Sequence, residues 1–185
     1  YENALGEVVI GSTNSATLGS NTGSQQAQQA NVPPAPTLSN GSGAYYNKLD
    51  VTVVTGGNAS DATYVIAVST DNFLTTNYLQ ADGTIGASPL FRTYAQWGSA
   101  SGSTMVGLVP NTTYKVKVAA MQGQFTQSAY GPVATSSTTT PALAFSLSPN
   151  SVNLGSLLAG TVISGSGISV GYTTNAANGG FVYVK

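Results

Sequence analysis

The strongest constraint on the fold is a strict alternation of apolar and polar residues in the stretch TYKVKVAA, residues 113–120. Successive side chains of a β-strand point to opposite faces of the sheet, so one face of this segment is expected to be buried. Lys115 and Lys117 fall on the opposite face, toward solvent. Four side chains would share the buried face, namely Tyr114, Val116, Val118 and Ala120.

The same period of two recurs in KLDVTVV (residues 48–54), TYVIAVST (63–70) and MVGL (105–108). Turn signals rich in Gly, Asn, Asp, Pro and Ser separate these segments. No stretch repeats its apolar residues with the 3.6-residue period of a helix, so we predict an all-β chain with almost no helix. The predicted inward-facing residues are Leu49, Val51, Val53, Tyr64, Ile66, Val68, Val106 and Leu108.

Composition excludes several classes of function. Charged residues make up 6% of the chain and the five basic residues are scattered, whereas a nucleic-acid site needs clustered Lys and Arg. There is no Cys and no His, which excludes disulfides, thiol catalysis, the usual zinc sites and a Ser–His–Asp triad. No apolar run reaches the length of a membrane span. We expect no cofactor.

The chain divides by composition into three parts: residues 1–31, 32–140 and 141–185. In the first part, the β-type run EVVIGST (7–13) precedes a polar stretch (14–31) that we interpret as a flexible linker or an exposed loop. The prolines of VPPAP (32–36) favour an edge strand at the entrance to the second part. The chain begins with Tyr1 and not Met, which suggests a processed mature terminus or a trimmed sequence. We expect an extracellular or cell-surface location.

The segment GLVPNTTYKVKVAA places Leu108, Pro110 and Tyr114 at the spacing Leu-x-Pro-x-x-x-Tyr. This pattern resembles the E–F corner of fibronectin type III domains, in which the Tyr hydroxyl bonds to nearby backbone. VPPAPTL, LDVTVV, ATYVIAVSTDNF and SAYGPVATSSTTTP resemble the first strand, strands B and C, and the last strand. The resemblance covers residues 32–140. It implies a fibronectin type III/immunoglobulin-like β-sandwich with these three residues as a structural corner, and it implies no particular activity.

One departure from this family concerns tryptophan. The family usually buries a Trp on strand B, where this chain has Leu49 and Val51, and the only Trp, Trp97, lies between strands C and E. With Phe91 and Tyr94, Trp97 could form a flat platform on which a sugar stacks. The alternative is that these aromatic residues cap the sandwich or replace the missing Trp in the core.

The third part contains the β-type runs ALAFSLSP, SVNLGSLL, TVISGSGISVGY and FVYVK. They predict four or five strands, fewer than the about seven of an immunoglobulin-like sandwich. An Asn-Leu-Gly strand followed by a Thr-Asn-Ala-x-Asn-Gly turn is similar to the opening of repeated immunoglobulin-like domains in bacterial surface proteins. We therefore expect residues 141–185 to form a partial, incomplete sandwich.

Candidates for chemistry are few. A glycosidase needs two carboxylates across a cleft, and Asp71 and Asp82 are the pair that loops could bring together. The stretches STDN and ADGT carry oxygen ligands of the kind that Ca²⁺ prefers, without the spacing of an EF-hand. Solvated turn residues are the simpler interpretation, so we expect no enzyme and no metal site. Asn58 heads the best placed of three N-glycosylation sequons.

Two functions follow. In the first, the protein is an extracellular structural or adhesive subunit whose copies assemble, pilus-like, by β-strand donation, with copies of itself or other domains of the same surface protein as partners. The assembly residues would be Val8, Val9 and Ile10 as donor and Phe181 and Tyr183 in the receiving domain. In the second, it is a fibronectin-type spacer or carbohydrate-binding module of a larger secreted or surface protein, with glycans as the partner.

Overall fold

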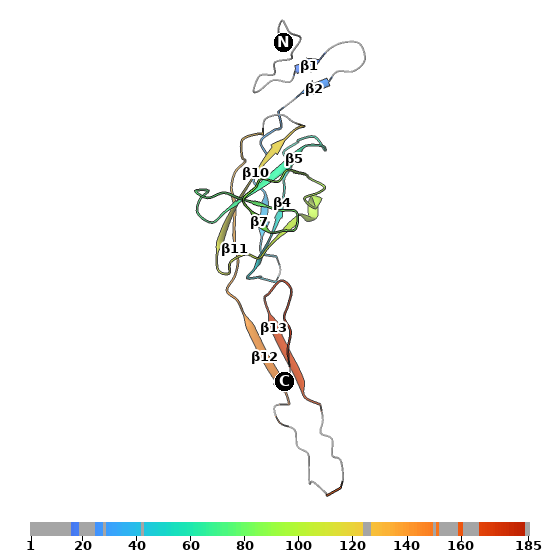
Figure 1. The fold of residues 1–185 in the computed structure, drawn as a ribbon, viewed down its shortest axis with the longest axis vertical. Helices are drawn as coiled ribbons and strands as arrows, with labels where there is room; N and C mark the ends of the chain where they lie inside the picture. Colours follow the sequence, from blue (N-terminus) through green and yellow to red (C-terminus); the bar gives the residue numbers. More distant parts are fainter. Residues whose placement is uncertain are drawn as a thin grey trace.

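The computed structural model describes residues 16–18, 25–27, 29–41, 43–123, 127–149, 151, 159–160 and 167–183. Its shape is elongated, with a β-sandwich between two hairpins (Figure 1). The N-terminal hairpin pairs β1 (Ala16–Leu18) with β2 (Gln25–Ala27), and the C-terminal one pairs β12 (Leu143–Ser148) with β13 (Ser169–Thr174). The all-β prediction is confirmed, because the one helical element in the described part is the 3-10 turn η1 (Ser99–Ser101).

The sandwich consists of two antiparallel sheets. The first has the strand order β3-β4-β9, formed by β3 (Thr37–Ser39), β4 (Lys48–Thr52) and β9 (Ser103–Val106). The second has the order β11-β10-β5-β6-β7, with β8 also pairing to β5. Its strands are β5 (Thr63–Ser69), β6 (Asn77–Leu79), β7 (Ile85–Gly86), β8 (Arg92–Thr93), β10 (Thr113–Met121) and β11 (Ala134–Ser137).

The core lies between these sheets, and the period-two pattern predicts most of it. On β10, Val116 and Val118 pair with Val68 and Ile66 of β5, and all four are buried. The prediction for β9 is wrong in one respect. This strand ends at Val106, and Met105 is its fully buried residue, paired with Leu49. The chain then turns at Gly107, whose φ of 70° suits glycine, and this turn returns Leu108 to the core.

The outer face of the second sheet is also covered, although the pattern predicts that it meets solvent. Val65, Ala67 and Ala119 lie on this face and are fully buried. Lys117 pairs with Ala67, and its ammonium group lies 3.9 Å from the ring centroid of Phe73 and 4.7 Å from that of Tyr130. These cation–π contacts hold the two aromatic rings beside Lys117 on the outer face of the sheet.

Two predictions for the ends of the chain need correction. The polar stretch 14–31 is not wholly linker, because Ala16 pairs with Ala27 and Leu18 with Gln25 in the β1–β2 hairpin. The terminal run FVYVK does not form a strand over its described residues 181–183. The runs EVVIGST and SVNLGSLL lie wholly or largely outside the described residues, and the boundaries at 31/32 and 140/141 stay predictions.

We predict that Leu49→Ala destabilises the sandwich by about 2 to 5 kcal/mol, because it leaves a cavity opposite Met105 in a fully buried site. The matched control is Leu74→Ala, since Leu74 is 90% exposed and its truncation should change stability by less than about 0.5 kcal/mol. Urea denaturation followed by the fluorescence of the single Trp measures both. Equal effects of the two substitutions would contradict the assigned core.

Candidate functional site

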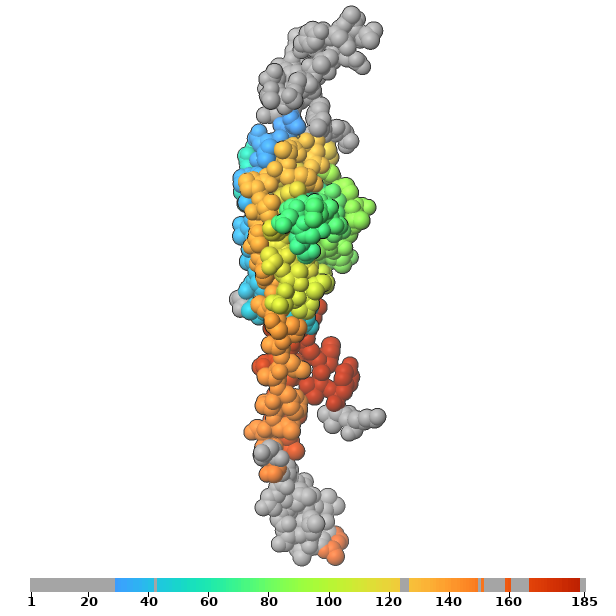
Figure 2. Space-filling view, turned by 90° about the vertical axis from the view of Figure 1, so that its left-hand side faces the viewer, coloured from blue at the N-terminus to red at the C-terminus, as the bar shows by residue number. Residues whose placement is uncertain are grey.

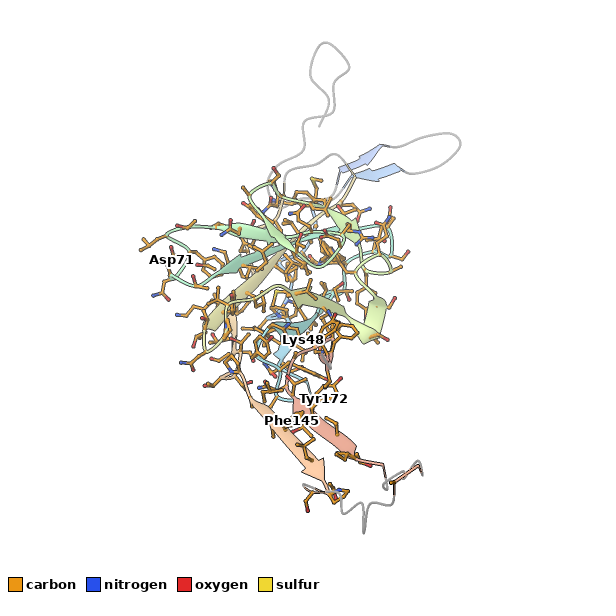
Figure 3. All side chains as sticks on the ribbon, turned by 60° about the horizontal axis from the view of Figure 1, so that its bottom comes forward. Lys48, Asp71, Phe145 and Tyr172 are labelled. Atoms are coloured by element: carbon orange, nitrogen blue, oxygen red, sulfur yellow. The ribbon has the colours of Figure 1, made fainter. Side chains whose placement is uncertain are left out.

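The most unusual surface of the molecule is one face of the β12–β13 ribbon. Phe145 pairs with Tyr172 and Leu147 with Val170, and directly paired residues of an antiparallel sheet share a face. Figure 3 labels Phe145 and Tyr172, side by side on the two strands. We define the apolar face of the ribbon as Leu143, Phe145, Leu147, Val170, Tyr172 and Thr174. The opposite face carries only small residues: Ala144, Ser146, Ser148, Ser169, Gly171 and Thr173.

This apolar face is open to solvent. Leu143 is 77% exposed and Phe145 59%, while Leu147, Val170 and Tyr172 are between 41% and 48% exposed. Figure 2 shows the two C-terminal segments, in orange and red, extending from the sandwich as a narrow arm. Removing apolar surface from water stabilises a protein or a complex by about 25 cal/mol per Å². Covering this exposed face would therefore stabilise a complex with a partner. Contiguous exposed apolar patches of this kind mark interaction sites.

The segment after β13 turns back toward the apolar face. The hydroxyl of Tyr172 donates a hydrogen bond to the carbonyl oxygen of Gly180. Between the two segments lies an open groove of about 390 Å³, lined by Leu143, Phe145, Tyr172, Thr174 and residues 180–183. None of these lining residues is charged, so the groove fits an uncharged, apolar occupant.

The predicted assembly residues fall in two places. Phe181 and Tyr183 line the groove but are 86% and 89% exposed, and they are not in a strand, because no described strand pairs with their backbone. Val8, Val9 and Ile10 lie outside the described residues. Sequence patterns gave no signal that Leu143, Phe145 and Tyr172 would be exposed, because alternation alone predicts a buried face.

The aromatic platform expected for sugar binding is not formed around Trp97. Its side chain is 1% exposed, and its indole N–H donates a 2.8 Å hydrogen bond to the carbonyl of Tyr64. Phe91 and Tyr94 are partly buried, and Tyr94 packs against the core. A buried ring offers no face for a sugar, and the position of Trp97 corresponds to the alternative interpretation, in which it fills the core.

Tyr114 lies at the predicted corner. It is 5% exposed, and its hydroxyl accepts a 2.8 Å hydrogen bond from the backbone N–H of Val109. Leu108 is buried beside it, and the carbonyl of half-buried Pro110 accepts a 2.9 Å bond from the hydroxyl of Thr112. This is the geometry of a tyrosine corner, which fixes the connection between β9 and β10.

The side chain of Asn58 is already engaged by the protein. Its Nδ2 donates to the carbonyls of Asn31 (3.0 Å) and Thr55 (2.8 Å), and its Oδ1 accepts from the N–H of Asn31 at 2.7 Å. A glycan on Nδ2 would replace a hydrogen used in one of these bonds. In this structure Asn58 holds the entering chain against the sandwich.

The two acids considered for catalysis each serve a turn of their own. Asp71 accepts from the hydroxyl of Ser69 at 2.7 Å and from the N–H of Thr75 at 3.0 Å, and these bonds lower its pKa. The side chain of Thr84, followed by its N–H, lowers the pKa of Asp82 in the same way. Within the described ranges, no cluster of three or more acidic, His or Cys side chains could hold a metal ion.

Among the comparisons with known proteins, only the search of solved structures gave matches. No family model and no curated protein matches the chain. Among solved structures, it is similar to a computationally redesigned β-sandwich protein, at 17% identity over 60% of this chain and 96% of the other, with a TM-score of 0.42. It is also similar to the third fibronectin III domain of the human KIAA0343 protein, at 14% identity over 68% and 94%, with a TM-score of 0.37.

The order of the strands defines the fold directly. β3, β4 and β9 correspond to strands A, B and E of an immunoglobulin-like sandwich, and β5, β10 and β11 to strands C, F and G of the facing sheet. The protein therefore has a fibronectin type III/immunoglobulin-like β-sandwich. None of the helical residues described forms a segment long and apolar enough to cross a membrane.

We predict that the carboxyl of Asp71 titrates below its ordinary value of 3.8, because Ser69 and Thr75 hydrogen-bond its charged form. Since the folded pKa is the lower one, this interaction stabilises the loop above the ordinary pKa. The stabilisation is lost as the pH falls through the lowered value. An NMR titration of the side-chain carboxyl carbons measures the midpoint.

Ser69→Ala should raise the midpoint of Asp71 and leave that of Asp82 unchanged, because Asp82 depends on Thr84. If both midpoints move together, or neither moves, the local hydrogen bonds are not the cause.

Proposed function

We propose that this protein is a structural or adhesive subunit of an extracellular, cell-surface assembly, in which the ribbon of one copy receives a strand from a neighbour. The fibronectin type III/immunoglobulin-like fold is consistent with a structural or adhesive module. The observation that carries the proposal is the apolar face of the ribbon, on which Leu143 and Phe145 are more than half exposed. A strand added at the edge of the ribbon would place its own apolar side chains beside this face and cover part of it.

The occupant that we propose is the segment 7–13 of another copy. Its run Val8-Val9-Ile10 is apolar and β-branched, which favours an extended strand. Val8 and Ile10 would point to one side of that strand, toward the uncharged groove. Main-chain hydrogen bonds to the edge of the ribbon would supply affinity, and these two side chains would supply specificity.

The arrangement of the chain supports assembly between copies. The β1–β2 hairpin, which follows the donor segment, and the β12–β13 ribbon lie at opposite ends of the long axis (Figure 1). Fully extended, the polar stretch 14–31 could span up to about 60 Å. Because Ala16 pairs with Ala27, the two ends of residues 16–27 lie side by side, and the reach of the stretch is much shorter. The hairpin that follows the donor segment in the sequence therefore lies far from the ribbon of its own chain.

A contact between opposite ends is heterologous, and its repetition gives a linear filament when the rotation does not close a ring. The low content of charge suits such packing, because like charges would otherwise repel at every repeated contact. No charged residue occurs between Lys117 and Lys185, the part of the sequence that contains the ribbon.

We predict that Phe145→Asp abolishes assembly, because it places a carboxylate on the apolar face where no partner neutralises it. The matched control is Ser146→Asp, which puts the same charge one residue away on the opposite face. Light scattering coupled to size-exclusion chromatography and negative-stain electron microscopy measure assembly. The wild type and Ser146→Asp should form oligomers that grow with concentration, and Phe145→Asp should remain monomeric.

Deletion of residues 1–13 should also give monomers, which then bind a synthetic peptide of residues 6–13 with one-to-one stoichiometry. Binding of this peptide should be lost in the deletion variant that also carries Phe145→Asp. Monomeric wild type at all concentrations, or assembly that survives Phe145→Asp, would overturn the proposal.

A further inference from the structure

The ribbon joins the sandwich at a junction organised by one side chain, that of Asn175, directly after β13. Its Nδ2 lies 3.2 Å from the carbonyl oxygen of Ala44, 3.0 Å from Oγ1 of Thr139 and 2.8 Å from the carbonyl oxygen of Thr140. Its Oδ1 accepts a 2.8 Å hydrogen bond from the N–H of Ala142. One amide thus contacts the β3–β4 loop, the segment that follows β11 out of the sandwich, and the residue just before β12.

Backbone contacts surround this amide. The N–H of Tyr46 donates to the carbonyl of Asn175 at 3.3 Å, and the N–H of Asn175 donates to the carbonyl of Ala142 at 3.4 Å. Two residues further on, the N–H of Ala177 donates to Oδ1 of Asn47 at 3.0 Å. The turn after β13 is therefore attached to the β3–β4 loop by both backbone and side chains.

The sandwich side of the junction is itself fixed. Thr138 is 3% exposed, and its hydroxyl donates to the carbonyl of Val109 at 2.7 Å, next to the tyrosine corner. The N–H of Thr139 donates to the carbonyl of Tyr45 at 3.2 Å. Asn175 therefore binds to groups that the sandwich holds in place, not to a free linker.

We propose that Asn175 is a positioning residue that locks the ribbon to the sandwich, so that the two move as one rigid rod. Without such a lock, units joined by a single segment move relative to one another by default. The role requires an amide, because the two hydrogens of Nδ2 face two carbonyl oxygens and a hydroxyl, while Oδ1 accepts from an N–H. Aspartate has the same shape, but its carboxylate has no donor and faces carbonyl oxygens.

This inference does not depend on strand donation between copies. If the ribbon is also the receiving surface, the lock would fix the direction in which each neighbour is added. Rigidity is measured within a single chain, so the two proposals fail separately.

The test uses the absence of Cys in the chain. Spin labels on cysteines introduced at Ser88 of the sandwich and Ser169 of the ribbon, both exposed, report the distance between the two units by double electron–electron resonance. The doubly labelled protein is mixed with an excess of unlabelled protein, so that the measured distances lie within one chain whether or not copies assemble. We expect a single narrow distance distribution with Asn175 present, and at least a twofold broader one in Asn175→Asp.

The matched control is Asn178→Asp, which introduces the same charge at an exposed position three residues away and should leave the distribution narrow. Fluorescence of buried Trp97 reports whether the sandwich remains folded in each variant. If Asn175→Asp does not fold, Asn47→Ala removes the acceptor of the Ala177 N–H and should give an intermediate width. A broad distribution in the protein with Asn175 intact, or a narrow one in folded Asn175→Asp or Asn47→Ala, would overturn the proposal.

Discussion

The apolar face of a β-sheet has to be covered by a second layer, and this requirement shapes the whole molecule. In the sandwich, Leu49 and Val51 of one sheet share a core with Ile66 and Val118 of the other. On the outer face of β5, Val65 and Ala67 are also fully buried. On the paired strand β10, Lys117 lies over two aromatic rings. The β12–β13 ribbon has the same period-two pattern, yet no described segment covers its apolar face beyond the contact at residues 180–183.

Period-two alternation predicts strands well wherever two sheets face each other. It identified the inward residues of β4, β5 and β10, and the Leu-x-Pro-x-x-x-Tyr spacing predicted the corner at Tyr114. Local patterns work here because each residue's environment is set by the face on which it lies. They gave no information on the burial of Val65, Ala67 and Ala119 on the outer face, because the pattern predicts that this face meets solvent.

The remaining features depend on contacts across long stretches of sequence. Trp97 reaches the carbonyl of Tyr64 from an irregular segment 33 residues away, which no periodicity predicts. Asn175 bonds to the carbonyl of Ala44 across 131 residues, so its role emerges only in three dimensions. The sequence identified the ribbon strands, but not that Leu143 and Phe145 would lie open to solvent, because exposure depends on whether a second layer is present.

Amide hydrogen exchange of the ribbon tests the central claim most directly, because strand addition must protect its edge amides as well as cover its side chains. The account predicts that residues 143–148 and 169–174 exchange slowly in wild-type assemblies and much faster in the variant without residues 1–13. Addition of the peptide of residues 6–13 should restore the protection. Equal exchange of these two segments in all three samples, with wild-type assemblies present, would contradict it.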